Sequence, residues 1–256
     1  MSTFAGDFEF AAVEVARLLE RSVAAAVEGE GQVAVSYSGG LDSSIIAKCA
    51  AKRTGVVACT ACARGSGDAA RAREGAEAMG LSLVTSELTE ENVGAALSAI
   101  DLPFAPTLMD KSLWCLYAAV SQSAHRAGAR VLLLGQLADE LFGGYAKYAE
   151  TLKARGESSA ESMMGADVKL YAARGRVRDV TACGRRVEAR FPFESAELVE
   201  FAGSLPVFFK IRDGERKAVL RRAASILGVP EKIIGIPKKA AQYSSGVQKL
   251  VVGSRF

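Results

Sequence analysis

A turn rich in serine and glycine near the amino terminus carries the residues best suited to chemistry. Ser38-Gly39-Gly40-Leu41-Asp42-Ser43-Ser44 follows the apolar run 32–37 and precedes a helical pattern at 43–53. Glycines let several backbone N–H groups point into one concavity, and the start of a helix adds partial positive charge. The turn is therefore suited to binding an anion such as a phosphate, although it lacks the lysine of a Walker A loop.

A second motif places another carboxylate after a strand. Asp139 and Glu140 lie in the segment 135–145, directly after Val131–Leu134, the most hydrophobic strand pattern in the chain. A carboxylate at Asp42 repels a bound phosphate unless a cation lies between them, and magnesium suits that position. If the strand order is 3-2-1-4, the first and fourth strands are adjacent where open α/β sheets bind ligands. Asp42 and Asp139 would then face one magnesium-bound nucleotide.

The elements that position these motifs alternate between strand and helix. Strand patterns occur at 32–37, 56–62, 81–86 and 131–134, and helical patterns at 8–28, 43–53, 68–79, 90–99 and 110–127. This alternation predicts an α/β fold in which a parallel sheet carries helices on both faces. Beyond residue 146 the sequence predicts helices near 147–155, 163–174, 195–203 and 215–227, with a mobile loop at 156–159. We expect one domain over 1–256, divided softly into a nucleotide-binding core (1–146) and a helical part (147–256).

Composition excludes several classes of protein. The 256 residues are half hydrophobic, with a formal net charge of +3, so the whole chain lacks the basic excess typical of nucleic-acid binding. The amino terminus has no signal-peptide pattern and no apolar run approaches about 18 residues, so we expect a cytoplasmic protein without membrane contact. Five cysteines without framework spacing fit a reducing compartment. Cys59 and Cys62 lie in an apolar run and are interpreted as buried strand residues.

Four motifs together resemble a known family. The segment 38–44 looks like the pyrophosphate-binding loop of the N-type ATP pyrophosphatases (PP-loop proteins). The segments 138–145, 187–193 and 237–246 resemble the synthetase domain of asparagine synthetase, which is related to β-lactam synthetase. The resemblance implies an adenine nucleotide α-hydrolase-like fold and a ligase of the kind found in amino-acid biosynthesis. In that reaction ATP adenylates a small-molecule carboxylate, pyrophosphate and AMP are released, and nitrogen is transferred to the acyl group.

The resemblance also implies roles for individual residues. Asp42 and Asp139 would hold magnesium, and Lys238, with Lys239 as its alternative, would neutralise charge on the phosphates and the acyl-adenylate. Glu188 is a candidate to line the site. The candidate catalytic residues are therefore Lys238, Lys239 and Glu188. The residues expected to bind ATP and pyrophosphate are Ser36, Ser38, Gly39, Gly40, Leu41, Asp42, Ser43, Ser44, Ala61, Leu134 and Gly135.

Two departures from the family pattern leave the second half-reaction open. The chain opens Met1-Ser2, so we expect no glutaminase region with its catalytic cysteine; free ammonia, a separate glutaminase or another nucleophile altogether would then be needed. Asparagine synthetases carry a glutamate where this chain has Gln136, and an amide cannot act as a general base. Glu188 or Glu140 would substitute, or the second half-reaction differs.

Two alternatives remain beside carboxylate amidation. One is an RNA-modifying ATP pyrophosphatase that adenylates a base before sulfur or nitrogen transfer, with Cys59, Cys62 or Cys183 as sulfur carriers. The other is a nucleotide-binding protein that has lost synthetase activity. Structural roles are expected for His125, Trp114 and Tyr117. A basic cluster is interpreted as a solvated helix face, with an RNA-binding strip as the alternative; it comprises Lys210, Arg212, Arg216, Lys217, Arg221 and Arg222.

Overall fold

The computed structural model describes residues 7–184, 186–236 and 241–254, and it does not describe the side chains of 241 and 242. Lys238 and Lys239, the predicted catalytic lysines, therefore lie outside the described residues. Among the described helices, none combines the length and apolar character that crossing a bilayer requires.

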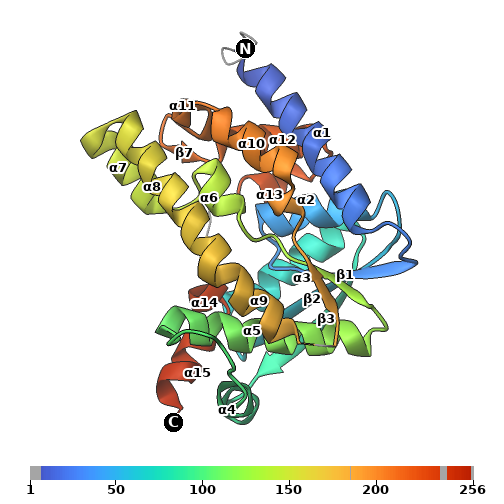
Figure 1. The fold of residues 1–256 in the computed structure, drawn as a ribbon. Helices are drawn as coiled ribbons and strands as arrows, with labels where there is room; N and C mark the ends of the chain where they lie inside the picture. The colour runs from blue at the N-terminus through green and yellow to red at the C-terminus, as the bar shows by residue number, and fades with distance from the viewer. Residues whose placement is uncertain (1–6, 185, 237–240, 255–256) are drawn as a thin grey trace.

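A five-stranded parallel sheet forms the centre of the fold (Figure 1). Its strands are β1 (Gln32–Ser36), β2 (Gly55–Ala63), β3 (Ser82–Leu88), β4 (Val131–Leu133) and β5 (Glu188–Arg190), in the order β3-β2-β1-β4-β5. The first four strands have the order 3-2-1-4 that was considered as a condition above, and β1 pairs directly with β4 through Ala34–Leu132 and Val35–Leu133. The loops that follow β1 and β4 consequently meet at one edge of the sheet.

Helices cover both faces, as predicted (Figure 1). Val33 and Val35 of β1 belong to one apolar core and Ala34 to the other, because successive side chains of a strand point to opposite faces. The first core is covered by α1 (Phe8–Ala26), α2 (Leu41–Ala50), α3 (Gly67–Met79) and α12 (Ala218–Ile226). The second is covered by α4 (Glu90–Ser98), α5 (Leu108–Arg126), α9 (Arg176–Cys183) and α15 (Val247–Gly253).

The carboxyl-terminal part is less purely helical than predicted. It supplies β5, a short antiparallel pair of β6 (Ile211–Arg212) and β7 (Glu215–Arg216), and the helix α9 that the pattern did not predict. The loop expected at 156–159 is also wrong, since α8 (Glu157–Leu170) begins directly after Gly156. The remaining elements are α6 (Ala138–Phe142), α7 (Ala146–Arg155), a π-helix (Tyr171–Gly175), a 3-10 turn (Pro192–Glu194), α10 (Ala196–Ser204), α11 (Val207–Lys210), α13 (Glu231–Ile234) and α14 (Ala241–Ser244).

Candidate functional site

The turn after β1 has the geometry of an anion-binding loop. Gly39 adopts a φ of +69°, which glycine tolerates without steric cost. The Ser43 hydroxyl accepts from the Ser38 backbone N–H (3.3 Å) and donates to the Gly40 carbonyl (3.2 Å), so the side chains close the turn on itself. Within the described chain no side-chain hydrogen bond from the N-cap residue Gly40 caps the start of α2. The first N–H groups of a helix have no acceptor within the helix, so a helix start of this kind attracts anions.

Helix α3 and the chain end support this turn from behind. Arg71 Nε donates to the Ser38 carbonyl (2.9 Å), and its guanidinium pairs with Asp68. Asp68 also accepts from the Ser244 hydroxyl (2.8 Å), so the carboxyl-terminal segment is tied to the same place. A side chain at position 39 would collide with the Arg71 carbonyl oxygen. Glycine is therefore required there by space as well as by conformation.

A buried lysine joins the turn after β1 to the turn after β4. The Lys217 ammonium lies 2.7 Å from both carboxylate oxygens of Asp42 and 2.7 Å from Asp139 Oδ1. The lysine side chain is only 4% exposed and each carboxylate 12%. The predicted meeting of Asp42 and Asp139 is thus supported by the geometry, since both contact one cationic group. The basic pattern around Lys217 had indicated a solvated face, so sequence reasoning missed this residue.

The backbone around this ion cluster is strained. In the described chain three non-glycine residues have positive φ, and two of them, Leu137 (+74°) and Lys217 (+60°), adjoin the cluster. Such conformations cost about 1–3 kcal/mol each and concentrate at functional sites. Gly144 packs so closely that a Cβ would collide with Asp139 Oδ1 and the Lys217 side chain. The fold therefore holds the two carboxylates and the ammonium at close quarters.

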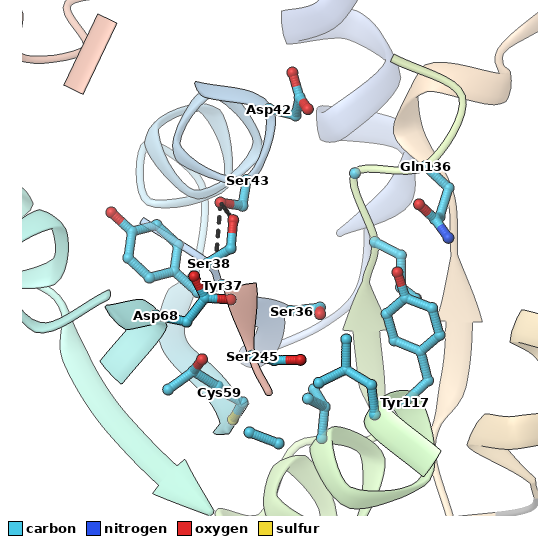
Figure 2. A pocket seen from close by; sticks show the side chains of 16 residues that line it. Ser36, Tyr37, Ser38, Asp42, Ser43, Cys59, Asp68, Tyr117, Gln136 and Ser245 are labelled. Carbon is cyan, nitrogen blue, oxygen red and sulfur yellow. Dashed lines mark hydrogen bonds between the residues drawn. The ribbon is translucent and has the colours of Figure 1, made fainter. Parts of the chain in front are cut away.

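A small cavity of about 90 Å³ lies between the two turns. Figure 2 shows Ser38 and Ser43 on one side, Tyr117 and Gln136 on the other, and Ser36 and Ser245 between them. The predicted residues that line it are Ser36, Ser38, Asp42, Ser43, Ala61, Leu134 and Gly135. Gly39, Gly40, Leu41 and Ser44 shape the turn without lining the cavity, and the Ser44 hydroxyl donates to Tyr37 (3.1 Å).

Several lining residues were not singled out as ligand-binding from sequence. Tyr117, expected to be structural, lines this cavity, as do Thr60, Asp68 and Ser245. Ser245 belongs to the predicted tail motif, and its carbonyl accepts from the Ala63 backbone N–H (2.8 Å). The described end of that motif therefore lies at the site. Thr60 lies within the second strand pattern and Asp68 follows it, and no other feature of the sequence indicated that either residue binds a ligand.

A larger cavity of about 810 Å³ adjoins the small one, and Tyr117 and Gln136 line both. Gln136 Nε2 donates to Asp179 Oδ2 (2.6 Å), and Arg178 bonds to Asp179 (2.8 Å) and to Asp110 (3.0 Å). Burial raises the pKa of the Asp179 carboxyl, although Arg178 and Gln136 oppose this. The hydrogen bond from Gln136 to this buried carboxyl group fixes the side-chain amide in place.

The two glutamates proposed to replace the family's base occupy different places. Glu140 is 9% exposed, lines the larger cavity and accepts from the Tyr145 hydroxyl (2.7 Å); burial raises the pKa of its carboxyl. Glu188 lies at the start of β5 beside Val131, is 63% exposed and pairs with Arg190. Since nucleotide-binding loops follow the carboxyl ends of strands, the structure does not bring Glu188 to either cavity.

The cysteines and most of the basic cluster are used within the fold. All five cysteines are buried, and burial raises the pKa of the Cys59 and Cys183 thiols to about 12. The interpretation of the basic cluster as a solvated face is wrong for Lys217, for Arg216, which donates to the Gly144 carbonyl (2.8 Å), and for the buried Lys210. Trp114 is structural, as expected, and donates to the Ala96 carbonyl (3.0 Å).

Fold and site together define a class: an α/β protein in which a glycine-containing turn and two carboxylates follow the adjacent strands β1 and β4. The direction of the strand connections reverses between these strands, and open α/β sheets bind ligands at such a position. Comparison with protein families is more specific. The Asparagine synthase family model matches residues 14–182 and 152–253. The chain belongs to the asparagine synthase family.

Relatives of known name agree with this assignment. The chain is 32% identical over 272 residues to a putative glutamine-hydrolyzing asparagine synthetase of Methanocaldococcus jannaschii, covering 92% of this chain and 50% of the relative. It is 32% identical over 161 residues to mouse asparagine synthetase domain-containing protein 1, covering 56% and 26%. The chain thus spans half or less of these relatives. An NMN synthetase structure from Francisella tularensis overlays at a TM-score of 0.45 with 14% identity, covering 98% of this chain and 88% of that chain.

Proposed function

We propose that the chain is an ATP-dependent ligase that adenylates a carboxylate, releases pyrophosphate and AMP, and transfers nitrogen to the acyl group. The observation that supports this most is the contact of Lys217 with both Asp42 and Asp139 beside the turn 38–44. It joins an anion-binding turn, a cationic group and two carboxylates within one site. Such a set matches the charge distribution of a magnesium-bound nucleotide.

The two carboxylates fit magnesium. One ammonium lies 2.7 Å from both of them, so Asp42 and Asp139 converge on a position that a cation can share. In the described residues no group of three or more His, Cys, Asp or Glu side chains could hold a metal. Magnesium commonly uses only one or two carboxylates and takes its other ligands from substrate phosphates and water. When bound, it would neutralise charge on the pyrophosphate that leaves.

In the first half-reaction the residues of the turn and Lys217 have different roles. The N–H groups at the start of α2 bind the β- and γ-phosphates, and Lys217 turns from the carboxylates toward the phosphate oxygens. An acceptor carboxylate oxygen attacks the α-phosphorus, the bond from this phosphorus to the bridging oxygen breaks, and pyrophosphate leaves. Because the small cavity of about 90 Å³ is below the ~300–1,000 Å³ of ordinary ligand sites, nucleotide binding requires its walls to shift. Lys238 and Lys239 remain proposed participants.

Glu140 is the better placed base for the second half-reaction. Ammonia attacks the acyl carbon, the bond to AMP breaks, and a proton passes from nitrogen to the Glu140 carboxylate. A raised pKa makes a carboxylate a stronger base near neutral pH. Gln136, held by Asp179, would orient the acyl group through its remaining polar atoms. The exposed position of Glu188 does not favour it for this role.

Acid-dependent exchange of labelled pyrophosphate into ATP tests the proposal, because exchange requires a reversible adenylation step. Wild type should exchange pyrophosphate when a suitable acid is present and should form AMP when ammonia is added. Asp42→Ala should lose at least about a hundredfold in exchange, the effect of removing an important transition-state contact. Release of ADP and phosphate in place of AMP and pyrophosphate would show that the mechanism is wrong.

A further inference from the structure

The larger cavity has the size and position of an acceptor site. Its volume of about 810 Å³ lies in the range of sites that enclose drug-sized ligands, and aspartate would fill only a small part of it. Gln136 and Tyr117 line both this cavity and the small one, so they lie where the two cavities adjoin. Asp139 also lines the larger cavity. A carboxylate placed at the wall formed by Gln136 and Tyr117 would lie beside the phosphate-binding turns while the rest of the molecule extended into the cavity.

Part of the lining of this cavity is apolar. Leu113, Met109 and Leu170 line it together with the rings of Tyr145 and Tyr171. Met109 is 48% exposed and Leu170 is 54% exposed, although both are large apolar side chains. Exposed apolar surface at a cavity is typical of a ligand-binding groove rather than of an ordinary protein surface. The two side chains come from α5 and α8, which are distant in sequence.

The charged side chains of this cavity are largely engaged with one another. Arg178 pairs with Asp110 and with Asp179, and Lys147 pairs with Asp167. Aspartate carries an ammonium and two carboxylates, and each would need its own charged partner when desolvated. Pairing within the walls leaves few such partners, whereas an apolar body needs none.

The π-helix gives an independent indication that this region binds a ligand. Tyr171 and Arg174 of this segment line the cavity, and the Arg174 guanidinium lies 4.0 Å from the centre of the Phe104 ring. Single-turn π-helices occur frequently at functional sites, because the widened turn re-aims side chains. Here the widened turn directs side chains at the same cavity as the exposed apolar residues.

We propose that the acceptor is a monocarboxylic acid with an apolar aliphatic or aromatic body, larger than aspartate. The inference rests on the proposed adenylation of a carboxylate. The carboxylate lies at the wall formed by Gln136 and Tyr117, and the apolar body packs against Leu113, Met109 and Leu170. A body of this kind gains affinity by removing the exposed apolar side chains from water.

Two matched pairs of variants separate cavity residues from equally exposed neighbours. Met109→Asp places a charge in the cavity, and Leu108→Asp changes the adjacent residue, which is 42% exposed and does not line it. Both lie in the first turn of α5, where an aspartate favours the helix, so both variants should fold. Leu170→Asp and Val180→Asp form a second pair; Val180 is 40% exposed and lies outside the cavity.

The experiment measures binding and chemistry separately. Octanoate, 3-phenylpropionate and aspartate are titrated calorimetrically into each protein, with and without magnesium and α,β-methylene-ATP, and the same acids are tested in ATP–pyrophosphate exchange. The two apolar acids should bind wild type more tightly than aspartate does. Met109→Asp and Leu170→Asp should weaken that binding at least about tenfold, as expected for a charge opposed to an apolar group, and the control variants by less than about twofold.

The outcomes distinguish this inference from the proposed function. Tighter binding of aspartate, no binding of either apolar acid, or equal losses within each matched pair would overturn the inference; exchange with aspartate would then still support adenylation. Selective binding of the apolar acids that Met109→Asp weakens at least about tenfold supports the inference. If that binding occurs while no acid supports exchange, the cavity selects as inferred and the proposed adenylation is wrong.

Discussion

Replacing Lys217 by methionine should destabilise the folded protein, because the Asp42 and Asp139 carboxylates then repel each other. The substitution removes the ammonium and keeps most of the side-chain volume, leaving Asp42 and Asp139 without the cation that lies 2.7 Å from each. The nearest carboxylate oxygens can be no more than about 5.4 Å apart, since both contact one nitrogen. At an effective dielectric constant of about 20, two such charges repel by about 3 kcal/mol. This agrees with the ~3–5 kcal/mol typical of breaking a buried ion pair.

Urea denaturation at pH 7.5 measures this prediction. Lys217→Met should lower the free energy of unfolding by about 3 kcal/mol. Saturating magnesium should recover more than half of that loss, because a second cation can occupy the position between the carboxylates. Lys52→Met is the control: its partner is Glu20, the two side chains are 45% and 43% exposed, and such surface pairs contribute less than about 1 kcal/mol.

A double variant distinguishes charge repulsion from a general loss of folding. Lys217→Met combined with Asp139→Asn removes one of the two repelling charges, so it should be more stable than Lys217→Met alone. A loss below about 1 kcal/mol in Lys217→Met, or a magnesium effect equal in Lys52→Met, would refute the reasoning. So would a double variant no more stable than the single one.

Four further outcomes follow from other residues. Glu140→Gln should keep pyrophosphate exchange and lose amide formation, and equal losses in the two assays would contradict its role as base. Gly144→Ala should reduce exchange at least about a hundredfold, since its methyl group displaces Asp139. Burial lowers the pKa of Lys210 to about 8, so the folded protein binds this proton less tightly than the unfolded chain; the penalty is complete below about pH 8 and fades toward pH 10.5. Lys210→Met should therefore raise the free energy of unfolding by about 3 kcal/mol at pH 7 and by little at pH 10.5, in urea titrations at both values. Burial raises the pKa of the Cys59 thiol to about 12, so iodoacetamide at pH 8 should alkylate it slowly before and rapidly after denaturation, as mass spectrometry will show.

Most of the sheet could be predicted because each strand carries its own local pattern. The apolar runs at 32–37, 56–62 and 131–134 correspond to β1, β2 and β4 to within a residue or so at each end. Strand β5 could not be predicted in this way. It has three residues, two of them charged, and it forms by parallel pairing with β4. A segment so short becomes a strand through its neighbour and not through its own propensity.

The same contrast holds for the site. Seven of the predicted binding residues line the small cavity because they lie at the carboxyl ends of β1 and β2 or in the segments that directly follow β1 and β4, so their positions follow from those strands. Glu188 also belongs to a recognisable motif, yet it lies at the opposite end of its strand. The motif indicated the segment correctly and gave no direction for the individual side chain.

The amino-acid sequence by itself determined the turn 38–44, the two carboxylates that follow strands and the parallel character of the sheet, because each depends on local pattern and on the general rules of strand connection. Only the tertiary structure decided which cation meets those carboxylates. Lys217 is 175 residues from Asp42 in the chain, and its strained backbone is imposed by packing. The cavity of about 810 Å³ is also a tertiary feature, since helices α5 and α8 and the π-helix build it jointly. Contacts of this range depend on how whole elements dock, and no local pattern in the sequence records them.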